Sequence, residues 1–178
     1  MSSGKLAAMK RLALVLLLAA AAPLAAAPHP VTTVILVRHA EKASADRDTA
    51  LSDAGHERAR ELARVLTGVK IDTIFTTEFT RTKQTAAPTA QALGLTPIVR
   101  NTGPAYAADL AKEIRTQHAG KTVLVVGHSN TTIDVLKALG ATGLPVIDEP
   151  HFDNLFVLTD VEGAEPTVVA LRFGAAMP

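Results

Sequence analysis

Two arginines and two histidines stand at places in the sequence where side chains can act together on one ligand. Arg38 and His39 are neighbours that follow a β-branched run, and His128 follows a second apolar run. Arg81 lies between them, at an expected junction of strand and helix. Because open α/β sheets carry their chemistry at the carboxyl ends of the strands, we expect the four side chains to converge. Two guanidinium groups and two imidazoles are suited to binding a phosphate.

Three segments around these residues carry a family resemblance. They are LVRHAE at 36–41, TTEFTRTKQTA at 76–86 and VLVVGH at 123–128. In this order they resemble the histidine phosphatase superfamily, the phosphoglycerate-mutase-like proteins, which have an Arg-His-Gly/Ala signature near the start. The resemblance covers about residues 31–173. It implies an α/β fold, a three-layer α/β/α sandwich around a mostly parallel mixed sheet.

The resemblance also implies a role for each site residue. His39 is the expected nucleophile, which forms a phosphohistidine that water then hydrolyses. Arg38 and Arg81 are expected to hold the phosphate oxygens, and His128 to donate a hydrogen bond to the transferring group. Asn130 is expected to line the same pocket and to bind substrate. The implied activity is that of a phosphoric monoester hydrolase acting on a small phosphorylated substrate, with no metal and no cofactor.

The nucleophile has to be neutral in order to attack phosphorus. A free histidine has a pKa of about 6.5. Two neighbouring arginines disfavour a further positive charge, so we expect Arg38 and Arg81 to lower the pKa of His39. The neutral imidazole then dominates at pH 7.

The proton donor for the leaving group is not identified by the sequence. Family members that act on alkyl phosphates use a carboxylic acid, often in the segment after the second arginine, and residues 100–108 contain none. Asp109 and Glu78 are the nearest candidates, and Glu41 and Asp153 are further ones; each can equally be a surface or ion-pair carboxylate. A missing acid costs about 10² to 10⁴ in rate, which favours substrates with good leaving groups.

Two other functions remain open from the sequence. Residues 127–131, GHSNT, resemble the Gly-x-Ser-x-Gly nucleophile elbow of α/β-hydrolases, with Ser129 as the nucleophile of a serine esterase. Thr131 replaces the second glycine, and the elbow leaves Arg38, His39 and Arg81 without a role. The second alternative is a secreted module that binds a phosphorylated ligand without turnover.

The first residues have the layout of a secretory signal peptide. Lys5, Lys10 and Arg11 precede an apolar run at 12–22, which is followed by small residues up to Ala27. We expect residues 1–27 to be removed and residues 28–178 to form one histidine phosphatase domain in the periplasm or outside the cell. The alternative is an uncleaved N-terminal anchor. No later segment has the roughly 20 apolar residues that a membrane span needs.

The amino-acid composition limits the kinds of partner and chemistry that we expect. Removal of residues 1–27, with three basic and no acidic residues, lowers the formal net charge from +1 to −2. Without a block of positive charge, nucleic acid is not an expected partner. The chain has no cysteine, which excludes disulfides, thiolate catalysis and cysteine-based zinc sites. The oligomeric state and the physiological substrate are left open.

Hydrophobic periodicity predicts alternating strands and helices after the signal segment. Ser52 or Asp53 is expected to cap the first helix, and Gly94, Gly120 and Gly140 to end or follow the later ones. The polar loop 43–49 is expected to line the mouth of the site. The expected helices are 56–66, 79–93, 105–118 and 131–139, and the expected strands are 31–37, 71–76, 96–99, 122–126, 154–159 and 168–173.

Overall fold

A computed structural model describes residues 29–149 and 151–177 of the chain. The predicted signal segment, residues 1–27, lies outside this part. Within the described ranges, no helix combines the length and the apolar character that a bilayer crossing requires.

Six strands form one mixed sheet in the order β3-β2-β4-β1-β5-β6. The strands β3, β2, β4 and β1 run parallel, and β5 and β6 are added as an antiparallel pair beside β1. The carboxyl ends of β1, β2 and β4 therefore meet at one edge of the sheet. The bounds are β1 Val31–Arg38, β2 Thr73–Thr77, β3 Ile98–Arg100, β4 Thr122–Gly127, β5 Asn154–Val161 and β6 Thr167–Arg172.

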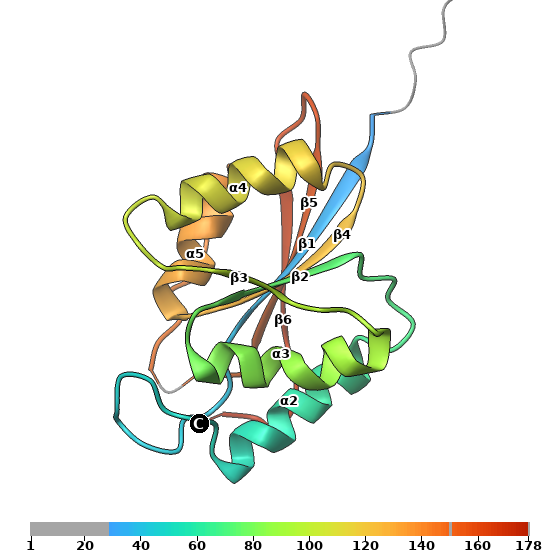
Figure 1. Cartoon of the computed structure of the whole chain (residues 1–178). Helices are drawn as coiled ribbons and strands as arrows, with labels where there is room; N and C mark the ends of the chain where they lie inside the picture. The colour runs from blue at the N-terminus through green and yellow to red at the C-terminus, as the bar shows by residue number, and fades with distance from the viewer. Residues whose placement is uncertain (1–28, 150, 178) are drawn as a thin grey trace, which may run out of the picture.

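Two helices cover each face of the sheet, as Figure 1 shows. The helices α2 and α3 pack on one face, and α4 and α5 pack on the other, so the chain forms the expected three-layer α/β/α sandwich. The bounds are α2 Asp53–Val65, α3 Thr80–Leu93, α4 Tyr106–Gln117 and α5 Ser129–Ala138.

The central strand β1 is buried on both faces, because helices cover both. Val34 and Leu36 join the apolar core under α4 and α5, whereas Ile35 and Val37 join the core under α2 and α3. This explains why the strand has a continuous apolar run instead of alternating polarity. Burial on both faces also holds the residues that follow the strand in a fixed position.

Capping groups set the helix ends that position the site. Of the two N-cap candidates for α2, Ser52 has this role: its side chain accepts a hydrogen bond from the Gly55 amide, 3.2 Å away. Gly94 ends α3 in the left-handed conformation, with a φ of 65°. The helix α5 begins at Ser129, two residues before the predicted start.

Candidate active site

The five site residues expected from the sequence lie around one open cavity at the carboxyl edge of the parallel strands. Arg38 ends β1 and His39 follows it, His128 follows β4, Arg81 is in the first turn of α3 and Asn130 is in the first turn of α5. All five line the cavity, whose volume is about 330 Å³.

Hydrogen bonds fix the orientation and the tautomer of His39. Its ring is almost fully buried, and its Nδ1 lies 2.8 Å from the carbonyl oxygen of Ala40. Since a carbonyl can only accept, Nδ1 carries the proton and the lone pair is on Nε2. The His39 amide donates to the Gly127 carbonyl at 2.8 Å, which ties this residue to the end of β4. Nε2 is thus the nitrogen available as a nucleophile.

Both site histidines are neutral at pH 7 in this environment. Burial lowers the pKa of His39 to about 3; its hydrogen bond to Ala40 opposes the shift, and the charges of His128, Arg81 and Arg38 add to it. Burial also lowers the pKa of His128 to about 4, and Arg81 contributes further. The pKa of His39 thus moves in the expected direction, but burial, not the arginines, is the largest cause.

A chain of hydrogen bonds fixes His128. Its Nδ1 accepts from Arg81 Nη2 at 3.2 Å, so the proton is on Nε2, which donates to Thr77 Oγ1 at 3.0 Å. Thr77 in turn contacts Thr82 Oγ1 at 2.9 Å, and this hydroxyl donates to the Phe79 carbonyl at 2.8 Å. To donate to a phosphoryl oxygen through Nδ1, His128 has to gain a proton, which the negative charge of a bound phosphate favours.

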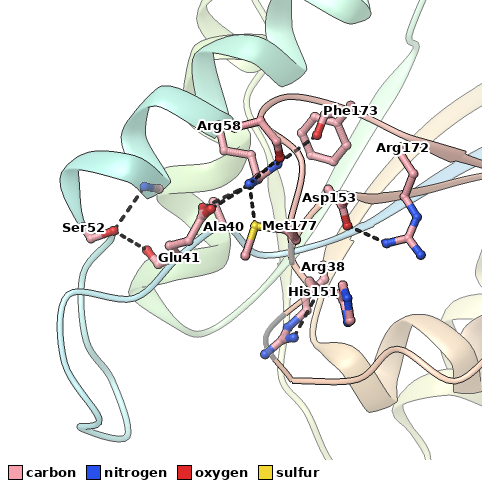
Figure 2. Close-up of polar contacts among 12 residues, drawn as sticks. Arg38, Ala40, Glu41, Ser52, Arg58, His151, Asp153, Arg172, Phe173 and Met177 are labelled. Carbon is pink, nitrogen blue, oxygen red and sulfur yellow. Dashed lines mark hydrogen bonds and ion pairs between the residues drawn. The ribbon is translucent and has the colours of Figure 1, made fainter.

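The Arg38 guanidinium is 2% exposed and is surrounded by the segment that precedes β5. Its Nη1 lies 3.4 Å from the Asp148 carbonyl and 3.3 Å from that of His151, and Nη2 forms an ion pair with Glu149. Figure 2 shows the guanidinium beside His151. The charge also lies 4.2 Å from the centroid of the Phe152 ring. These contacts hold Arg38 rigidly at the cavity wall.

Arg81 reaches the cavity from α3 and is held by the loop after β1. Its Nη1 donates to the Arg47 carbonyl at 2.7 Å, and its charge lies 4.4 Å from the centroid of the Phe79 ring. The loop 43–49 therefore contacts the site through this arginine, although it is Lys42, just before the loop, that lines the cavity. Among the residues that the structure describes, the Nε atoms of Arg38 and Arg81 are buried and have no hydrogen-bond partner.

The two nearest candidates for the general acid are unsuited to that role. Glu78 accepts hydrogen bonds from the Thr102 amide at 2.9 Å and from its hydroxyl at 2.6 Å. Burial raises the pKa of Glu78, but the hydrogen bonds from Thr102 outweigh it and the net pKa is below the ordinary value. Asp109 lies in a separate hollow of about 480 Å³, lined also by Arg100 and Glu113.

The two further candidates form structural ion pairs. Arg58 donates to the Glu41 carboxylate from Nε at 2.9 Å and from Nη2 at 2.8 Å. Arg172 donates to Asp153 at 2.5 Å, and Figure 2 shows both pairs. Each carboxylate is thus engaged by an arginine that is not part of the cavity wall.

The sequence reasoning missed Glu149, which also lines the cavity. It lies in an irregular segment without periodicity, so no local pattern marks it. The one signal is topological: β5 runs antiparallel to β1 with Leu155 paired to Val37, so the residues just before β5 return to the carboxyl end of β1. Thr77, which orients His128, was likewise not singled out.

Comparisons with known proteins agree with this fold. Residues 34–102 match the model of the histidine phosphatase superfamily (branch 1). Among solved structures, a protein assigned as the phosphohistidine phosphatase SixA from Nakamurella multipartitia is 25% identical, with a TM-score of 0.59, over 84% of this chain and 100% of that one.

Two further structures share the fold at lower identity. A mycobacterial glucosyl-3-phosphoglycerate phosphatase is 17% identical, with a TM-score of 0.61, over 78% of this chain and 97% of its own. A protein histidine phosphatase SixA bound to tungstate is 20% identical, with a TM-score of 0.63, over 79% of this chain and 96% of that one. No curated protein matches the sequence. The matched residues, which include both site arginines and His39, resemble the histidine phosphatase superfamily (branch 1), and the described chain shares its fold with solved phosphatases of this kind.

Proposed function

We propose that this protein is a phosphatase that hydrolyses a phosphomonoester through a phosphohistidine intermediate on His39. The observation that carries the proposal is the placement of His39: its Nδ1 donates to a carbonyl, so the Nε2 lone pair is available in a cavity lined by Arg38 and Arg81. A neutral nucleophile between two fixed cations is what attack on a phosphate dianion requires.

The reaction has two displacement steps. The guanidinium groups of Arg38 and Arg81 bind the phosphate oxygens and neutralise their charge. His39 Nε2 attacks phosphorus while the bond to the leaving oxygen breaks. Water then attacks the phosphohistidine, which releases inorganic phosphate and restores the neutral imidazole. His128, protonated at Nδ1 when phosphate is bound, stabilises the charge on the transferring group.

The substrate class that fits is a small phosphorylated molecule. The cavity of about 330 Å³ is open and has polar and cationic walls, which suits a phosphate with a modest organic group. Two proteins with this fold are named for a phosphorylated sugar derivative and for phosphohistidine. Screening phosphorylated metabolites, sugars and envelope components for phosphate release would identify the substrate.

The contacts of the first turn of α5 disfavour the serine esterase. The neighbouring histidine, His128, has both ring nitrogens engaged by Thr77 and Arg81, so neither accepts a proton from Ser129. The other group near Ser129 is Glu149, whose pKa is held below its ordinary value mainly by the hydrogen bond from Arg38, so this carboxylate is a weak base. A nucleophilic serine needs a base within hydrogen-bond reach.

The test measures activity on p-nitrophenyl phosphate and p-nitrophenyl acetate for the wild type, His39→Ala and Ser129→Ala. We expect phosphate release by the wild type and Ser129→Ala, none by His39→Ala, and no effect of EDTA. Acid-labile, base-stable phosphate trapped on His39 by rapid quenching would identify the intermediate. Acetate hydrolysis that depends on Ser129 would favour the esterase, and phosphate binding without release would favour the binding module.

We also propose that the enzyme acts in the periplasm or outside the cell. Support comes from the basic residues and apolar run within residues 1–27. Cell fractionation followed by N-terminal sequencing should find the protein in the exported fraction with this segment removed. Recovery of the uncut chain from the cytoplasm would contradict the proposal.

A further inference from the structure

Hydrolysis of an alkyl phosphate needs a proton donor for the leaving oxygen, and most carboxylates near the site are engaged elsewhere. Glu78 is held by Thr102 and Glu41 by Arg58. Neither of these carboxylates lines the cavity that holds His39. Arg58 also lies outside this cavity, and Glu78 is held in part by the backbone amide of Thr102.

Glu149 differs from these carboxylates in its position and in its partner. It lines the cavity together with His39, and its carboxylate pairs with Nη2 of Arg38. The Glu149 side chain is 69% exposed, whereas that of Arg38 is 2% exposed. The carboxylate can therefore move, and the guanidinium cannot.

A phosphate that binds Arg38 through Nη2 has to displace Glu149. In the free protein the hydrogen bond from Arg38, its charge and that of Lys42 hold the pKa of Glu149 below its ordinary value, against a smaller opposing effect of burial. Displacement removes the Arg38 hydrogen bond and puts a dianion beside the carboxylate. Both changes favour the protonated acid.

We propose that Glu149 is the general acid and base of the phosphatase reaction, an inference that rests on the proposed function. As the His39 Nε2–P bond forms and the P–O bond to the leaving group breaks, Glu149 gives its proton to the leaving oxygen. In the second step the Glu149 carboxylate takes a proton from the water that attacks the phosphohistidine. The P–N bond breaks, and the acid is restored for the next cycle.

The test compares Glu149→Gln with the wild type on esters of increasingly poor leaving groups: 2,4-dinitrophenyl, p-nitrophenyl, phenyl and glycerol phosphate. A good leaving group needs no proton, so we expect less than about a threefold loss of kcat/KM on dinitrophenyl phosphate. The loss should grow to about 10²-fold or more on glycerol phosphate. Glu149→Asp, which keeps the acid on a shorter side chain, should recover part of that activity.

The matched control is Glu57→Gln, the same chemical change on the exposed face of α2, where Glu57 pairs with Arg60. It should match the wild type on every ester. A loss of equal size on all four esters in Glu149→Gln would overturn the proposal, as would unchanged or faster turnover, which is the result for a carboxylate that only competes with phosphate. If the wild type hydrolyses none of the esters through His39, the proposed function itself fails.

Discussion

At the scale of single residues, the hydrogen bond at Nδ1 decides what each of the two histidines can do. Ala40 accepts from Nδ1 of His39 and leaves Nε2 as the nucleophile, whereas Arg81 occupies Nδ1 of His128 and leaves Nε2 to Thr77. The same side-chain type therefore presents a different nitrogen at each position. Assigning the roles needs these contacts, because the sequence gives only the residue types.

The buried neutral state of His39 predicts how stability depends on pH. Its pKa is about 3 in the folded protein, against about 6.5 in the unfolded chain. Between these values the unfolded state binds a proton that the folded state does not, so stability falls as pH falls below about 6.5. We expect this residue to account for a loss of about 2 kcal/mol between pH 7 and pH 5.

Urea unfolding of the wild type and His39→Asn at pH 7 and pH 5 measures this effect. Between pH 7 and pH 5 the free energy of unfolding of the variant should fall by about 2 kcal/mol less than that of the wild type, whatever the stability of the variant at pH 7. His29→Asn is the control, because the His29 side chain is 60% exposed and lies outside the buried site. An equal acid loss in the wild type and His39→Asn would show that His39 is not held neutral by the fold.

At the scale of elements, the parallel pairing of β1 with β4 brings the two histidines together. Arg38 is in register with Gly127, so the next residue of each strand lies side by side and the ring centroids of His39 and His128 are 5.3 Å apart. This pairing joins residues about 90 positions apart in the sequence. A strand end is visible in the sequence, but its neighbour in the sheet is not.

Local signals account for what the sequence predicted well. Apolar runs and capping residues indicated every strand and helix of the described chain, with ends within three residues of those observed, because these signals depend on nearby residues. The strand order and the position of Glu149 beside Arg38 depend on long-range packing. Neither could be derived from periodicity, and proximity in the sequence did not single out Glu149 among the carboxylates.

The contact of α2 with the loop after β1 leads to a second prediction. A Cβ added at Gly55 would overlap the Glu41 carbonyl oxygen and lie 3.1 Å from the Glu41 amide and from Leu51 Cβ. Gly55→Ala should therefore push the helix away from this loop and cost about 1 to 3 kcal/mol of unfolding free energy. Because Glu41 is two residues from His39, phosphate release should fall as well.

Thermal or urea unfolding together with p-nitrophenyl phosphate turnover checks the Gly55→Ala variant. Gly103→Ala is its control, because a Cβ at Gly103 meets nothing within 4 Å. The control should stay within about 0.5 kcal/mol of the wild type. If the two variants behaved alike, close packing of α2 on the loop would not explain the need for glycine at 55.

At the scale of the whole molecule, Arg58 connects three distant parts of the chain. From α2 it pairs with Glu41 after β1 and donates to the carbonyls of Phe173 at 2.8 Å and Ala175 at 3.1 Å. Figure 2 shows Arg58 between Glu41 and Phe173, with Met177 beside it. The segment after β6 is thereby fixed against the loop that carries His39.

Because Arg58 is 3% exposed, removing one member of its ion pair leaves the other charge in a largely buried place. Arg58→Met keeps the side-chain volume but leaves the Glu41 carboxylate without its cationic partner. We therefore expect the free energy of unfolding, measured with urea, to fall by about 3 to 5 kcal/mol. The double variant Arg58→Met, Glu41→Gln removes both charges and should regain part of that loss, while the carbonyls of the C-terminal segment stay without their donor. If the double variant were no more stable than Arg58→Met, the stranded charge would not be the cause, and the carbonyl contacts alone would account for the role of Arg58.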